Sequence, residues 1–181
     1  MPEELVIRHC SPTLAGLKTA NMFACSYENE AALKNDVTAF NKRFATKGIR
    51  VVPLRYSNGK ALIYIFRPSR LEADLSDVKA DKVLRRCGYH CGDISKCLSD
   101  LINRIEESEE FPHEIGIFLG YPPEDVIGFI EKRECQATGF WKVYSNKDKA
   151  EKTFDQFRKC MNVYYKCWNE GFTLERLTVS I

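Results

Sequence analysis

The spacing of apolar residues predicts several helices along the chain. One stripe recurs at intervals of three and four residues: Leu33, Val37, Phe40 and Phe44. This spacing is typical of one face of a helix, which we expect to end at Gly48 because glycine readily adopts the left-handed conformation there. The same periodicity predicts a helix over residues 94–105, capped by Asp93, and a long one over residues 150–168, closed by Gly171.

Two other segments have the composition of strands. Residues 49–56 and 61–67 are rich in β-branched and aromatic side chains, and Asn58 and Gly59 stand between them. Both turn residues tolerate a positive φ, so the pattern predicts a β-hairpin. Pro53 predicts that the first strand lies at an edge of the sheet, because proline lacks the N–H that a central strand needs.

The remaining apolar segments complete the predicted fold. We expect helices at 68–74, 77–86 and after Pro122, a central buried strand at 115–119, and a strand at 141–144. The order of elements predicts an α/β (α+β) fold, with a mixed β-sheet that includes the Asn-Gly hairpin and is flanked by helices. Nothing resembles a linker, so residues 1–181 are expected to form a single globular domain.

Composition and charge exclude some classes of function. The formal net charge of the 181 residues is only +2, and acidic and basic residues are interspersed along the chain. A dedicated nucleic-acid-binding protein normally concentrates its basic residues on one face, so we expect no nucleic-acid partner. The chain lacks both a long apolar run and a signal-peptide pattern, which predicts a cytoplasmic protein without a membrane partner. Its oligomeric state is not predicted.

The strongest candidate for chemistry lies near the N-terminus. After a short strand or turn at Leu5–Ile7, Ser11 has the properties of an N-cap and Pro12 those of a first helical residue. The spacing of Leu14, Leu17, Ala20 and Ala24 predicts that this helix continues to about residue 24. Cys10 would then face the N-terminus of a helix. Free amides and aligned peptide dipoles stabilise an anion there, so a thiolate at Cys10 would be favoured.

This arrangement suggests a thiol-dependent enzyme or a sulfur-handling protein. Cys10 would be the nucleophile, with His9 or Arg8 tuning its reactivity. The anionic group of a small substrate would be held by Arg8, Ser11, Thr13 and Lys18. A buried cysteine beside a surface histidine is the structural alternative. Most of the eight cysteines are expected to be small buried apolar residues, because the cytosol keeps thiols reduced.

A second hypothesis assigns no catalysis to the chain. The same turn can bind a phosphate-bearing cofactor such as a flavin or a nucleotide, or the protein can dock on a redox partner protein. No glycine-rich loop supports a dinucleotide-binding fold. Planar cofactors stack on aromatic side chains, and the candidates are Trp141, Tyr144, Tyr164, Tyr165 and Trp168, although helical spacing favours a core position for Tyr164 and Trp168. Tyr121 is a candidate for lining a pocket, because it follows the strand predicted at 115–119 and open α/β sheets place ligands at such strand ends.

A group of metal-binding residue types also occurs, namely Cys87, His90, Cys91 and Cys97. Thiolate and imidazole groups suit zinc. Three residues separate the first two cysteines, whereas paired zinc ligands usually have two between them. We therefore favour a loop followed by a core-facing Cys97, and predict no metal site.

Three motifs point to a known family. These are His-Cys-Ser-Pro-Thr-Leu from His9, Gly-Tyr-Pro-Pro-Glu-Asp-Val from Gly120, and Trp-Lys-Val-Tyr from Trp141. With them the chain resembles, over almost its whole length, a bacterial family of unknown function found mostly in anaerobic Gram-positive bacteria. The resemblance implies a stand-alone cytosolic domain in which many free thiols are tolerated. It supplies no activity, cofactor or catalytic residue.

Overall fold

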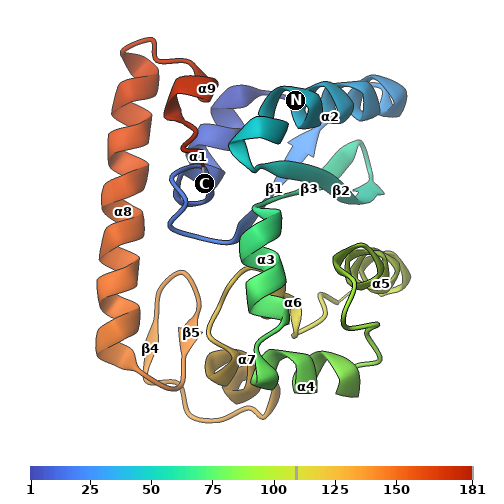
Figure 1. The fold of residues 1–181 in the computed structure, drawn as a ribbon, viewed down its shortest axis with the longest axis vertical. Helices are drawn as coiled ribbons and strands as arrows, with labels where there is room; N and C mark the ends of the chain where they lie inside the picture. Colours follow the sequence, from blue (N-terminus) through green and yellow to red (C-terminus); the bar gives the residue numbers. More distant parts are fainter. Residues whose placement is uncertain (109, 181) are drawn as a thin grey trace. The chain divides into compact units, whose positions relative to one another are not determined.

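A computed structural model describes residues 1–108 and 110–180 (Figure 1). The chain forms two compact units. Unit 1 comprises Met1–Ser69 with Lys159–Ile181, and unit 2 comprises Arg70–Arg158. The single domain expected from the sequence stays a prediction, and each unit is described by itself.

Unit 1 is built on a three-stranded sheet of β1 (Ala20–Ser26), β2 (Arg50–Ser57) and β3 (Lys60–Phe66), in the order β1-β3-β2. The predicted hairpin is confirmed, with positive φ angles of 50° at Asn58 and 70° at Gly59. β2 is an edge strand, as Pro53 indicated, and its register shifts between Pro53 and Arg55. The pairing, expected to be mixed, is antiparallel in every strand pair described.

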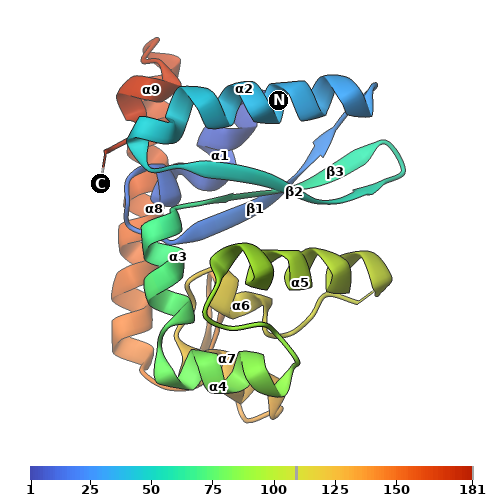
Figure 2. The same ribbon diagram turned by 45° about the vertical axis from the view of Figure 1, so that its right-hand side comes forward.

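Helices α1 (Glu3–Leu14) and α2 (Glu30–Phe44) cover one face of this sheet (Figure 2). The Asn29 side chain caps α2 by accepting a hydrogen bond from the Ala32 amide. A short 3-10 turn, η1 (Ala45–Lys47), follows α2 and ends at the predicted Gly48, whose φ is 69°. The apolar stripes of both helices pack with the sheet and with α9 (Leu174–Leu177) into one buried core.

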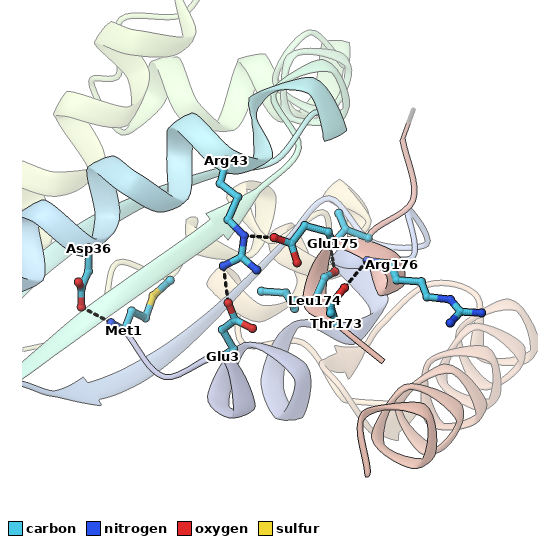
Figure 3. Close-up of polar contacts among 9 residues, drawn as sticks. Met1, Glu3, Asp36, Arg43, Thr173, Leu174, Glu175 and Arg176 are labelled. Atoms are coloured by element: carbon cyan, nitrogen blue, oxygen red, sulfur yellow. Dashed lines mark hydrogen bonds and ion pairs between the residues drawn. The ribbon is translucent and has the colours of Figure 1, made fainter. Parts of the chain in front are cut away.

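An ion-pair bridge joins three helices of unit 1 at its surface (Figure 3). The Arg43 guanidinium on α2 donates to the carboxylates of Glu3 on α1 and Glu175 on α9. Close by, the N-terminal ammonium group binds Asp36. These contacts tie the first and last helical segments of unit 1 to α2.

The start of α1 corrects the prediction made from Ser11 and Pro12. The helix begins at Glu3, so Leu5–Ile7 is neither strand nor turn, and Ser11 and Pro12 lie in its last turn. It ends at Leu14, and Ala20 and Ala24, predicted to continue it, lie in strand β1. Helical spacing of Val6, Cys10 and Leu14, all buried, explains the early start. Acidic residues in the first turn compensate the helix dipole. Pro12 lies inside the helix, where it lacks the N–H that would otherwise bond to the carbonyl of Arg8.

Unit 2 is mainly helical. Its elements are α3 (Pro68–Leu75, which begins in unit 1), α4 (Val78–Arg86), α5 (Ile94–Glu107), α6 (Ile115–Phe118), α7 (Pro123–Ile130), β4 (Ala137–Thr138), β5 (Lys142–Val143) and the first half of α8 (Lys147–Asn169). The carboxylates of Asp77 and Asp93 cap α4 and α5. Helices α4 and α7 pack side by side, joined by the ion pair of Lys79 with Glu124 (Figures 1 and 2).

Residues 115–119 form the short helix α6 with its C-cap, not the central strand predicted. Gly116, Ile117, Phe118 and Leu119 are all buried. A segment enclosed on every side shows no alternation of apolar and polar residues, so its pattern cannot separate strand from helix.

The α/β class, the hairpin and the flanking helices are confirmed. Within residues 1–108 and 110–180, no helix combines the length and apolarity needed to cross a membrane.

Candidate functional site

The structure removes the geometry that motivated the site around Cys10. Cys10 lies in the third turn of α1 rather than ahead of a helix, and its side chain is fully buried. Burial raises the pKa of this thiol well above its ordinary value, and the opposing effect of the Lys18 charge is smaller. The prediction of a thiolate beside a helix N-terminus is therefore wrong in its geometry.

The other residues of that predicted site have separate contacts. The Ser11 hydroxyl donates to the Ile7 carbonyl, Thr13 Oγ1 donates to the Asn21 side-chain oxygen at 2.7 Å, and Lys18 Nζ donates to the Ala20 carbonyl. These three side chains are buried, and their polar groups form hydrogen bonds within unit 1.

Arg8 and His9 point the other way, toward solvent. The His9 ring stacks on Phe23 with centroids 5.8 Å apart, and partial burial followed by the Arg8 charge lowers its pKa. The six residues are thus not arranged around one anion site. A catalytic role for Cys10 and His9 stays a prediction, without the helix terminus on which it depended.

The residues considered for a metal are also engaged elsewhere. His90 Nδ1 lies 2.9 Å from the Asp100 carboxylate, and Cys97 is buried, which raises the pKa of its thiol to about 12. Cys91 Sγ makes long contacts with the carbonyls of Asp81 and Tyr89. Among the described residues, no three His, Cys, Asp or Glu side chains are grouped so that they can hold a metal ion.

Unit 2 contains a cavity of about 260 Å³ with mostly apolar walls. Its lining combines the segment before α6, the first residues of α6, the α6–α7 turn, one face of α7 and the segment that enters β5: Phe111, Pro112, His113, Ile115, Gly116, Tyr121, Asp125, Val126, Phe129, Trp141 and Lys142. Tyr121 and Trp141, named from the sequence as pocket and stacking candidates, are both part of it.

The aromatic side chains around this cavity are ordered by their contacts with each other. Tyr121 and Trp141 stack with ring centroids 5.1 Å apart. The His113 ring meets Phe129 edge-on at 5.0 Å, and Lys142 Nζ lies 5.4 Å from the centre of the Phe129 ring. Phe111 and Phe129 remain 42% and 37% exposed, which leaves apolar ring surface open to a ligand.

A buried carboxylate fixes the wall that carries Trp141. Asp125 is 3% exposed, and its Oδ2 accepts a hydrogen bond from the Trp141 indole N–H at 2.7 Å. Its Oδ1 accepts hydrogen bonds of 2.8 Å from the amides of Tyr144 and Ser145 and from the Ser145 hydroxyl. With four donors satisfied, this carboxylate positions the β4–β5 hairpin and its following turn on α7.

Two glycines allow the close packing behind the cavity. A Cβ on Gly128 would lie 2.5 Å from Cβ and Cγ of Tyr144, and one on Gly116 would lie 2.8 Å from Val126 Cγ2. Such distances are shorter than van der Waals contact. Helices α6 and α7 can therefore approach the hairpin and each other only because both positions lack a side chain.

The charge of the cavity depends on ionisable side chains of its lining, among them Tyr121, Asp125 and Lys142. Burial raises the pKa of Tyr121, so its phenol is neutral at physiological pH. Lys142 provides an ammonium group at the rim, and the Asp125 carboxylate is already engaged by its donors. The arrangement can hold a flat apolar group and attract a negative charge beside it.

Sequence reasoning missed Phe111, His113 and Lys142. Two features of the sequence could have pointed to them: Phe111 is an aromatic residue directly after the acidic run, and Lys142 lies inside the Trp-Lys-Val-Tyr motif. Neither feature by itself predicts a binding site, because these residues come close to Tyr121 and Trp141 only when unit 2 is folded.

A search of curated proteins and a search of solved structures each gave no match to this chain. One family model matches residues 6–178, described as protein of unknown function (DUF3793). The match covers the cavity residues and most of α1, and it agrees with the expected resemblance to a family of unknown function. The chain belongs to the DUF3793 family.

Proposed function

We propose that this protein is a non-catalytic binding module whose unit 2 holds a small ring-bearing anion, such as the ring end of a phosphate-bearing nucleotide or flavin. The ring occupies the aromatic cavity and the anionic group stays at its rim. The observation that carries the proposal is a preformed apolar cavity whose aromatic walls are partly exposed.

The walls favour a flat ligand. Aromatic rings prefer offset-stacked or edge-to-face partners, and the cavity offers both arrangements through Trp141 and Phe129. Base stacking on an aromatic side chain contributes about 1–3 kcal/mol per base. That contribution is large enough to select a ring over an aliphatic group of similar size.

Charge and volume restrict the ligand further. Lys142 favours a negative group at the rim, where the acidic oxygens of Asp125 are already hydrogen bonded. Small-molecule sites usually measure about 300–1,000 Å³. At about 260 Å³ the cavity accepts one ring system, so a phosphate or carboxylate attached to it would lie outside, near Lys142.

Tryptophan fluorescence tests this proposal. The chain has two tryptophans, so the Trp168→Phe variant leaves Trp141 in the cavity as the reporter. We expect AMP and FMN to quench it saturably, and adenosine and riboflavin, which lack the phosphate, to bind less tightly. Absence of saturable quenching by all four compounds at millimolar concentration would contradict the proposal.

Two cavity variants separate stacking from charge. Phe129→Ala should weaken AMP or FMN binding about tenfold by removing one ring wall. Lys142→Gln should reduce the preference for the phosphorylated member of each pair while the unphosphorylated member binds as before. The matched control Lys149→Gln changes an exposed lysine of α8 outside the cavity and should alter neither value.

A further inference from the structure

A second cavity of unit 2 lies between α4 and α7 and measures about 380 Å³. Its apolar floor consists of Val83, Ile127 and Ile130, and basic residues of α4 form one rim: Lys79, Lys82 and Arg86. Positions 79, 82, 83 and 86 follow helical spacing, so they share one face of α4. We call this cavity the α4–α7 groove.

The rim of the α4–α7 groove carries uncompensated positive charge. Lys79 is paired with Glu124 across the two helices, and Glu131, the acidic residue of the lining, binds Arg133. Lys82 and Arg86 are exposed and have no ion-pair or hydrogen-bond partner in the part of the chain that the structure describes. Two cations, four positions apart, thus face an apolar trough.

We propose that the α4–α7 groove binds a single-chain fatty acid, with its acyl chain along the floor and its carboxylate at Lys82 and Arg86. An apolar trough with a cationic rim complements a ligand that has one long apolar part and one negative end. The nine residues of α4 extend for roughly 13 Å, which suits a medium-length acyl chain.

The size of the groove favours a small molecule over a protein. A stable protein partner usually buries about 800 Å² on each side and engages about 20–30 residues. The α4–α7 groove is lined by eight residues, whereas its volume of about 380 Å³ falls within the range of small-molecule sites.

This groove is independent of the aromatic cavity. Helix α7 turns Val126 and Phe129 toward the aromatic cavity and Ile127 and Ile130 toward the groove. No lining residue is shared between the two, so a ligand can occupy either one alone.

Decanoate, used below its micelle concentration, tests the proposal on the full chain by calorimetry and by ¹H–¹⁵N NMR. We expect saturable binding of one equivalent, with the largest shifts at residues 79–87 and 127–131. Butyrate, with a short chain, and decyltrimethylammonium, with the opposite charge, should bind much more weakly.

A double variant locates the carboxylate. Lys82→Gln with Arg86→Gln should weaken decanoate binding roughly five- to tenfold, as expected for two solvent-exposed ion pairs. The control pair Lys96→Gln with Lys149→Gln removes two other exposed lysines of unit 2 and should leave it unchanged. Lys142→Gln, at the aromatic cavity, should also have no effect, which keeps this test separate from that of the proposed function.

Three outcomes would overturn the inference: no saturable binding of decanoate, equal binding of decyltrimethylammonium, or unchanged affinity in the Lys82 and Arg86 double variant. Association with phosphatidylglycerol vesicles but not with free decanoate would also overturn it, because the groove would then recognise a membrane surface.

Discussion

Each unit contains a buried charged residue that holds several chain segments together. The two residues differ in whether a cavity lies beside them. Arg67 of unit 1 is 1% exposed and donates to four carbonyls: those of Thr13, Leu14, Lys47 and Val179. Asp125 of unit 2 accepts four hydrogen bonds in a similar way. The cation of Arg67 binds carbonyl groups that converge at the end of α1, and the anion of Asp125 binds N–H and O–H groups near β5.

The difference lies in what surrounds each anchor. In unit 1, Arg67 binds the Thr13 carbonyl, and the side chains of Cys10, Ser11 and Thr13 are all buried. Beside Asp125, partly exposed aromatic rings border a cavity. Polar and charged residues that suggest a binding site can therefore serve only to hold the fold together. The two cases are distinguished by whether the surrounding side chains are exposed to solvent.

Removing the anchor of unit 1 should have the largest effect. Arg67→Met keeps the bulk of the side chain but removes one donor from each of four carbonyls, of which those of Thr13 and Leu14 keep a backbone donor. We expect a loss of roughly 3–5 kcal/mol in the free energy of unfolding, because several buried hydrogen bonds from a charged group are lost together. Urea denaturation followed by circular dichroism measures it. Arg70→Met, at an exposed arginine, is the control and should change stability by less than about 0.5 kcal/mol. Equal losses in both variants would show that Arg67 is not an anchor.

Asp125→Ala should destabilise somewhat less, by about 2–4 kcal/mol, because the freed donors lie near a cavity that water can enter. Unlike the Arg67 variant, it should also disturb Trp141, which is visible as a shifted emission maximum in the Trp168→Phe background. Asp148→Asn, at an exposed acidic residue of α8, is the control. A normal Trp141 spectrum in Asp125→Ala would refute the positioning role of this carboxylate.

Burial of Cys10 predicts slow alkylation. Iodoacetamide reacts with the thiolate, and the raised pKa and full burial of Cys10 oppose both ionisation and access. In the native protein we expect Cys10 to react roughly a hundredfold more slowly than Cys135, which is partly exposed, as measured by peptide mass mapping. In urea the two rates should converge. Fast labelling of native Cys10 would instead revive the nucleophile hypothesis.

The surface bridge of unit 1 should give the smallest effect. Arg43→Ala removes the ion pairs with Glu3 and Glu175, which at a partly exposed site contribute about 0.5–1 kcal/mol (Figure 3). The hydrogen bond from Arg43 lowers the pKa of Glu175 below its ordinary 4.5. This contribution is therefore present above the unfolded-state pKa and is lost as the pH falls through the folded-state pKa.

Chemical denaturation at neutral and acidic pH, and at low and high salt, tests whether the stability contributed by Arg43 falls with pH. The difference between wild type and Arg43→Ala should shrink in acid and in salt. A difference that grows as the pH falls would contradict the assignment.

Local signals predicted much of the fold. The left-handed Asn58 and Gly59 specify their turn, and the carboxylate of Asp93 specifies the start of α5. The same kind of signal gave a wrong prediction at Ser11 and Pro12. Their Ser-Pro pattern is typical of a helix N-terminus, but it lies inside a helix whose start is determined by packing. Local capping preferences contribute about 1 kcal/mol, whereas burying one apolar side chain contributes about 1.5–3 kcal/mol, so packing prevails.

The candidate site was predictable only in part. Trp141 was named because aromatic rings stack on planar cofactors, and Tyr121 because it follows the strand predicted at 115–119. Both line the cavity, although residues 115–118 form a helix and not a strand. Their stacking, and the addition of His113 and Phe129, depend on contacts between residues distant in sequence that no local pattern encodes. The anchoring role of Asp125 was hidden for the same reason, since its position suggested only a charge in the first turn of a helix.

The irregular edge strand β2 has a consequence for behaviour in concentrated solution. An uninterrupted strand edge is a template on which the backbone of another molecule can add, the first step toward ordered aggregates. Pro53 and the adjoining bulge interrupt that template halfway along β2, so a neighbouring chain finds no continuous ladder of amides there.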